Sequence, residues 1–130
     1  MVMVIDSSAL VAIHLKEPEF SVLLDKIAGA ADKVVAAPTV LEAAIVLSGR
    51  MKQDARPLLA LLLRRLGIRV VPFGEEHYDA AIDAFLRFGK GRHPAALNFG
   101  DCIAYATAAL AELPLLYVGK DFAQTDIEAA

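Results

Sequence analysis

A short run of apolar residues at the start of the chain ends directly at an acid. Val2 to Ile5 reads Val-Met-Val-Ile, and Asp6 follows. Four consecutive apolar residues are too few for a helix and predict a strand buried on both faces of a parallel sheet. Ligands of open α/β sheets collect at the carboxyl ends of the strands, so this carboxylate stands where chemistry is expected. Taken alone, Asp6 is better explained as the cap of a helix that begins at Ser7.

The rest of the chain alternates between short apolar runs and helical patterns. Further strands are predicted over Val34–Ala37, Arg69–Val71 and Leu115–Val118, and the tail from Thr125 is a candidate fifth. Helices are predicted over Ser8–Lys16, Glu17–Ala30, Pro38–Met51, Pro57–Leu66, Glu75–Phe88 and Asn98–Glu112. This order predicts an α/β protein, a three-layer α/β/α domain with a central parallel sheet of four to five strands. By length, we expect residues 1–130 to form a single domain.

Composition limits the partners of the chain. Its formal net charge of −3 argues against a surface built for a polyanion, so any nucleic-acid contact should be local. Cys102 is the single cysteine, which excludes an intrachain disulfide and suits a reducing cytoplasm. Charges, prolines or glycines interrupt every apolar run, so we expect a cytoplasmic protein with no membrane segment. Hydrophobic residues make up 57%, and this surplus over typical domains indicates a buried interface.

Three more acids stand at junctions that lead into predicted helices, as Asp6 does; they are Glu42, Asp101 and Asp121. Each has a structural explanation of its own. Thr39 and Glu42 have the spacing of a helix capping box. Asn98 and Asp101 have a similar spacing. Asp121 fits a turn.

Together the four acids favour chemistry over capping. In a parallel sheet they converge near one edge, where carboxylates 5 Å apart repel by roughly 3 kcal/mol per pair at an effective dielectric constant of about 20. Such a cluster requires a cation, and oxygen ligands without Cys or His favour Mg²⁺ or Mn²⁺ over Zn²⁺. The chemistry that such a site supports is phosphoryl transfer or phosphodiester hydrolysis.

Four segments in this order carry a resemblance to a known family; they are Val4–Ala9, Pro38–Glu42, Leu97–Cys102 and Gly119–Phe122. They resemble a PIN domain and, more closely, the VapC ribonuclease toxins of bacterial toxin–antitoxin pairs. The resemblance implies an RNA endonuclease that uses Mg²⁺ or Mn²⁺, with Asp6, Glu42 and Asp101 as principal acids and Asp121 as the fourth. It also implies a cognate antitoxin, a homodimer, and contact with operator DNA only through the antitoxin.

Other residues near the acids are candidates for substrate contact. Ser7 or Ser8 matches the hydroxyl that follows the first acid in such proteins, and either fits a helix start equally well. Asn98 fits a cap better than a substrate contact. Asp126 competes with Asp121 for the position of the fourth acid, and we favour Asp121 because it directly follows the last predicted strand.

One loop is both flexible and basic. Gly89 to Ala96 reads Gly-Lys-Gly-Arg-His-Pro-Ala-Ala and lies a few residues before Asp101. Lys90, Arg92 and His93 are therefore candidates to hold the RNA backbone beside the acids, although a solvated loop explains them equally well.

Two other classes of acidic α/β protein are excluded by single positions. A phosphorelay receiver requires an aspartate at the end of the third strand, where this chain has Val71 and Pro72. A haloacid-dehalogenase-like phosphatase requires a second aspartate two residues after the first, where this chain has Ser8. A PIN-like protein that binds RNA without cutting it, or that acts as a repressor subunit with an antitoxin, stays open as the alternative.

Overall fold

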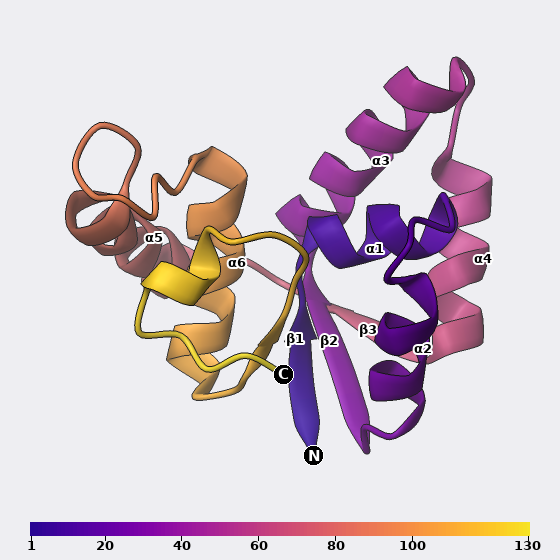
Figure 1. The fold of residues 1–130 in the computed structure, drawn as a ribbon, viewed down its shortest axis with the longest axis horizontal. Coiled ribbons are helices and arrows are strands. Elements are labelled where there is room, and N and C mark those ends of the chain that lie inside the picture. Colours follow the sequence, from indigo (N-terminus) through magenta and orange to yellow (C-terminus); the bar gives the residue numbers. More distant parts are fainter.

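The computed structural model describes residues 1–130 and has a parallel sheet at its centre (Figure 1). The strands are β1 (Val2–Ile5), β2 (Asp32–Ala36), β3 (Ile68–Val71) and β4 (Leu115–Leu116), and their order in the sheet is β3-β2-β1-β4. Val4 in the central strand pairs with Val34 on one side and with Leu115 on the other. The predicted parallel sheet is confirmed.

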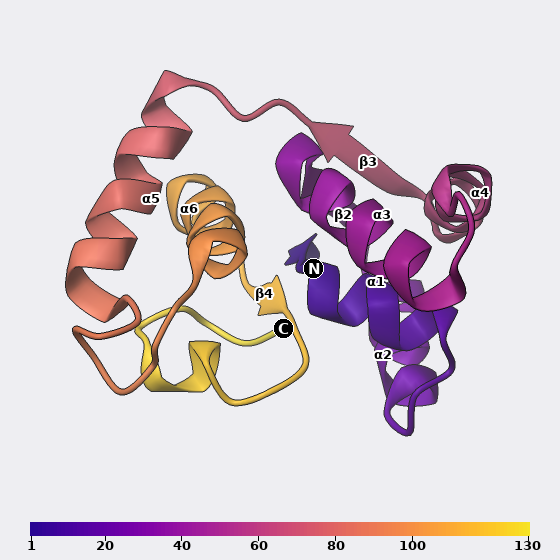
Figure 2. The same ribbon diagram turned by 90° about the horizontal axis from the view of Figure 1, so that it is seen from above.

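Helices cover both faces of the sheet, as expected for three layers (Figure 2). The helices are α1 (Ser7–His14), α2 (Phe20–Ala28), α3 (Ala37–Met51), α4 (Arg56–Leu66), α5 (Glu75–Phe88) and α6 (Phe99–Ala111). The four helices α1 to α4 lie on one side, and α5, α6 and the tail lie on the other. No helix is long and apolar enough to span a bilayer.

Two hydrophobic cores explain why β1 is apolar at every position and why β2 is apolar from Val34 to its end. Met3, Ile5 and Val35 belong to the core under α1 to α4, whereas Val4 and Val34 belong to the core under α5 and α6. Successive side chains of a strand point to opposite faces, so a strand that is covered on both faces must be apolar throughout. This arrangement fixes β1 in the middle of the molecule and Asp6 at its carboxyl end.

Helix α3 starts one residue before the predicted Pro38, and Thr39 does not cap it. The helix begins at Ala37, directly after β2, and Ala36 at its cap makes no side-chain capping bond. Thr39 is therefore the third helical residue, and its hydroxyl is buried without a hydrogen-bond partner. The predicted capping box of Thr39 and Glu42 is wrong, because the strand runs into the helix without a turn. Glu42 lies one turn further into the helix and is free of the capping role.

The end of the chain also differs in detail. The predicted strand Leu115–Val118 is reduced to Leu115–Leu116, because the Val118 amide donates to the hydroxyl of Ser8 and leaves the sheet. The candidate fifth strand is a single parallel bridge between Leu115 and Ala129. The C-terminus thus returns to the edge of β4 (Figure 2).

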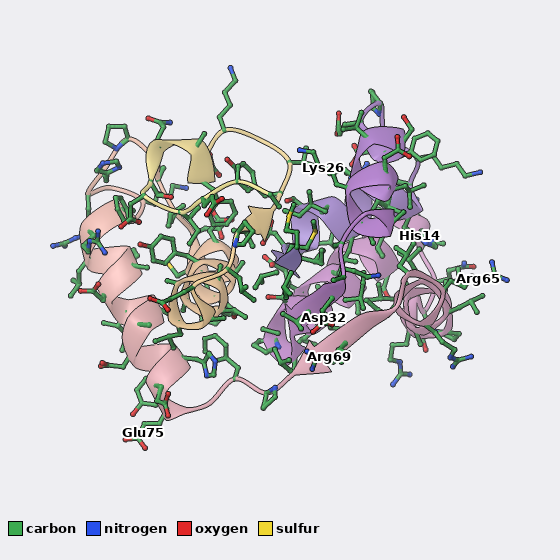
Figure 3. All side chains as sticks on the ribbon, turned by 90° about the horizontal axis from the view of Figure 1, so that it is seen from below. His14, Lys26, Asp32, Arg65, Arg69 and Glu75 are labelled. Atoms are coloured by element: carbon green, nitrogen blue, oxygen red, sulfur yellow. The ribbon has the colours of Figure 1, made fainter.

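Ion pairs fasten parts of the surface away from the acids. Arg69 on β3 and Asp32 on β2 lie side by side, with Nη2 and Oδ2 2.6 Å apart (Figure 3). The hydrogen bond from Arg69 holds the pKa of Asp32 below its usual value. In this protein, a carboxylate that faces a cation therefore has a lowered pKa.

Candidate active site

Asp6 is the most buried acid of the chain. It follows β1, caps α1 and is 2% exposed. Its Oδ2 accepts hydrogen bonds from the Ser8 amide at 3.1 Å and the Ser8 hydroxyl at 2.6 Å. Its Oδ1 is buried and has no hydrogen-bond partner. Burial, and less strongly the charges of Asp101 and Glu42, raise the pKa of Asp6 to about 6.

Asp101 lies in the first turn of α6, on the other side of the sheet from α1. Its amide donates to Oδ1 of Asn98 at 2.9 Å, and its own Oδ2 accepts from the Asn98 amide at 3.0 Å. The predicted capping box is confirmed here. Burial, followed by the charges of Asp121 and Glu42, raises the pKa of Asp101 to about 6. The capping hydrogen bonds therefore fix the position of Asp101 but do not neutralise its charge.

Glu42 is close enough to Asp6 and Asp101 for its charge to act on both acids. It is half-buried on α3. Asp6 precedes α1, Glu42 lies on α3 and Asp101 lies on α6, and these three helices begin on the side of the sheet where β1 ends (Figure 1). No Lys or Arg is among the groups that shift the pKa of Asp6 or Asp101. The three acids thus share a site without a neutralising partner.

Asp121 and Asp126 have different surroundings. Asp121 is exposed, precedes the short 3-10 helix Phe122–Gln124, and raises the pKa of Asp101 by its charge. Asp126 accepts hydrogen bonds from the Tyr105 hydroxyl and from Arg87 Nη2, the latter at 3.1 Å. The Tyr105 hydrogen bond is the main reason that the pKa of Asp126 is lowered. Asp121 therefore lies with the acids, whereas Asp126 holds the tail on α5 and α6.

The donor set at this site fits a hard divalent cation. It consists of carboxylate oxygens alone and includes the unpartnered Oδ1 of Asp6. The raised pKa values of Asp6 and Asp101 show that the charged forms of both acids are disfavoured without a cation. No group of three or more His, Cys, Asp or Glu side chains forms a ready-made metal cage. Binding of an ion would have to draw the carboxylates inward from this arrangement.

The two candidate serines have different positions. The Ser8 hydroxyl donates to Asp6 and accepts from the Val118 amide at 3.0 Å, so both functions are used within the protein. Ser7 is half-buried at the start of α1 and takes no part in this contact. Ser8 thus orients Asp6 and fastens the segment that leads to Asp121.

The basic loop lies at the same end of the molecule as the beginning of α6 (Figure 1). Nδ1 of His93 accepts from the Ala95 amide at 3.0 Å, and its ring packs edge-on against Phe88 at 5.1 Å. Nε of Arg92 donates to the Leu86 carbonyl at 3.1 Å. Lys90 is exposed and makes no side-chain hydrogen bond or ion pair. Of the three candidates, Lys90 is the one whose side chain makes no hydrogen bond within the protein.

Comparison with known proteins agrees with the fold. The PIN domain family matches residues 3–128, and this is the class that the four-stranded parallel sheet with acids at its edge defines. Ribonuclease VapC36 of Mycobacterium tuberculosis is 50% identical over 127 residues, which are 97% of this chain and 91% of the relative. Ribonuclease VapC of Mycolicibacterium smegmatis is 41% identical over 127 residues, which are 98% of each. The chain belongs to the VapC ribonucleases of the PIN-domain family, and the resemblance seen in the sequence is confirmed.

Solved structures of low sequence identity share the fold. The crystal structure of Mycobacterium tuberculosis VapC20, described as a sarcin-ricin loop cleaving toxin, has a TM-score of 0.78 at 13% identity and covers 98% of both chains. A toxin–antitoxin complex from Klebsiella pneumoniae gives a TM-score of 0.70 at 19% identity, covering 95% of this chain and 92% of that one. The fold is thus retained where most of the sequence has changed.

Proposed function

We propose that this VapC-type toxin endonuclease hydrolyses RNA with Mg²⁺ or Mn²⁺ held by Asp6, Glu42, Asp101 and Asp121. The observation that carries the proposal is the Asp6 carboxylate, which is 2% exposed, has an unpartnered oxygen and is subject to the charges of Asp101 and Glu42. A buried carboxylate in this setting is unfavourable without a cation. A bound ion of this kind would activate water and offset negative charge on the phosphate.

The residues of the chain have distinct tasks under this proposal. Asp6 and Asp101 bind the ion with the oxygens that their capping bonds leave free, and Glu42 and Asp121 complete the donor set. Ser8 and Asn98 fix the orientation of Asp6 and Asp101 through the hydrogen bonds described above. The exposed ammonium of Lys90 contacts the RNA backbone, which is the general way that proteins gain affinity for nucleic acid.

An exposed apolar surface supports protein partners. A groove of about 490 Å³ lies between α5 and the beginning of α6, and Pro38, Phe73, Phe85 and Phe99 are among its lining residues. A second groove of about 300 Å³ continues toward α3 past Leu41 and Ile45. Phe99 is 85% exposed and Ile45 64%. We assign this surface to the homodimer and the cognate antitoxin, with operator DNA contacted only through the antitoxin.

The test is cleavage of a structured RNA by the purified protein, freed of its antitoxin, in EDTA and after addition of Mg²⁺ or Mn²⁺. Cleavage should stop in EDTA and return with either ion. Glu42→Gln should fold normally, because Glu42 is not a cap, and should lose activity by orders of magnitude. Cleavage in EDTA would contradict the metal-dependent mechanism. RNA binding without cleavage in Mn²⁺ would favour the non-cleaving alternative.

A further inference from the structure

Gly100 and Glu42 approach each other more closely than any side chain at position 100 would allow. A Cβ placed on Gly100 would lie 2.5 Å from Cδ and 2.6 Å from Oε1 of Glu42, and closer still to Oε2. Real Cβ atoms essentially never come within 3.0 Å of another heavy atom. The Glu42 carboxylate on α3 therefore rests on the bare backbone of α6.

The backbone of Gly100 offers no other reason for a glycine. Gly100 is the second residue of α6, and it is absent from the positive-φ residues of the chain. Glycine is also among the poorest helix formers, so a helical position of this kind normally favours alanine. What the position requires is the missing side chain and not a special backbone conformation.

The contact has a direct consequence for the acids. Gly100 precedes Asp101, whose pKa is raised partly by the charge of Glu42. The beginning of a helix also favours a nearby negative charge, because the free amides of the first turn and the positive end of the helix dipole lie there. Because α3 lies close to α6 at Gly100, the Glu42 carboxylate reaches the first turn of α6, where Asp101 is located.

We infer that Gly100 is a positioning residue, whose lack of a side chain admits the Glu42 carboxylate to the metal site beside Asp101. The inference rests on the proposed function, because it assigns Glu42 to that site. The Glu42 carboxylate is the far end of a flexible side chain, so it yields by turning away when position 100 gains a Cβ. A substitution at Gly100 therefore displaces a ligand while leaving the fold in place.

The experiment compares Gly100→Ala with Gly49→Ala, an exposed helical glycine whose added Cβ would meet nothing within 4 Å. Binding of Mn²⁺ is measured by calorimetry, and thermal melts are recorded without metal. Gly49→Ala should bind Mn²⁺ as the wild type does. Gly100→Ala should melt at or above the wild-type temperature and bind Mn²⁺ roughly 10- to 100-fold more weakly, the range for lost support of a ligand.

Rescue by a shorter acid completes the design. Glu42→Asp withdraws the carboxylate from α6, so adding Gly100→Ala to that variant should weaken Mn²⁺ binding less than it does in the wild type. This comparison also applies if Gly100→Ala alone folds poorly. An equal loss in both backgrounds, or wild-type Mn²⁺ affinity in Gly100→Ala, overturns the positioning role. If Asp6→Asn and Glu42→Gln also bind Mn²⁺ as the wild type does, the proposed metal site itself has failed.

Discussion

The hydroxyl of Ser8 donates a hydrogen bond to Oδ2 of Asp6 at 2.6 Å and thereby leaves the other carboxylate oxygen as the unpartnered one. The same hydroxyl accepts from the Val118 amide, 110 residues away in the chain. One side chain thus orients the first acid and holds the segment that leads to Asp121. The sequence left a substrate contact and a helix start equally open for Ser7 and Ser8, and the structure gives Ser8 internal partners.

Ser8→Ala should therefore lower both stability and activity. The substitution leaves the Val118 amide without its acceptor and removes one bond from the Asp6 carboxylate, at a cost of about 1–3 kcal/mol in the free energy of unfolding. Cleavage per folded molecule should fall, because Asp6 is no longer held in one orientation. Ser7→Ala is the matched control in urea unfolding and RNA cleavage. Full activity of folded Ser8→Ala would show that the hydroxyl serves stability alone.

The metal-free protein should lose stability as the pH rises from about 4 to about 6. Asp6 has a folded-state pKa of about 6 against an ordinary value of 3.8, mainly because of burial, so the folded state binds the proton more tightly than the unfolded state. Protonation therefore stabilises the fold, and Asp6 accounts for roughly 2–3 kcal/mol between the two limits. Asp101 acts in the same direction.

Asp6→Asn should flatten this dependence, abolish cleavage and raise stability at pH 7 without metal, since it removes a buried charge. The measurement is urea unfolding in EDTA between pH 4.5 and 7.5. The lowered pKa values of Asp32 and Asp126 keep those acids charged over this range. A wild-type stability that rises with pH across the range would contradict the raised pKa of Asp6.

Asp121→Asn and Asp126→Asn should separate function from stability. Asp121 is exposed and influences Asp101, so Asp121→Asn should weaken Mn²⁺ binding and cleavage with little change in the thermal melt. Asp126 binds Tyr105 and Arg87, so Asp126→Asn should lower the melting temperature slightly and leave cleavage per folded molecule unchanged. The opposite pattern in melts and cleavage rates would make Asp126 the fourth acid.

Lys90→Ala should weaken RNA binding without changing the rate of cleavage at saturating RNA. Loss of one phosphate contact should reduce the slope of log Kd against log salt by about one. Arg65→Ala removes the same charge from α4, on the far side of the molecule from the basic loop, and serves as the control (Figure 3). Equal salt slopes for Lys90→Ala and the wild type would place the RNA elsewhere.

The strands, the helices and the acids of this protein follow from local sequence. A strand segment that is covered on both faces has to be apolar, and this made β1 and the apolar half of β2 from Val34 recognisable without knowledge of their neighbours. The capping box of Asn98 and Asp101 was also predictable, because its partners lie three residues apart. Parallel pairing then required Asp6, Glu42 and Asp101 to approach one edge of the sheet.

Contacts between distant segments were decided only by the tertiary structure. The bond between Ser8 and Val118, the close approach of Glu42 to Gly100 and the attachment of Asp126 to Tyr105 each join residues that no local pattern relates. Local pattern also suggested a capping box that does not form, because Thr39 and Glu42 have its spacing although α3 already begins at Ala37. Sequence periodicity reports which face of an element is buried, whereas the partner of a given side chain depends on how the packed elements meet.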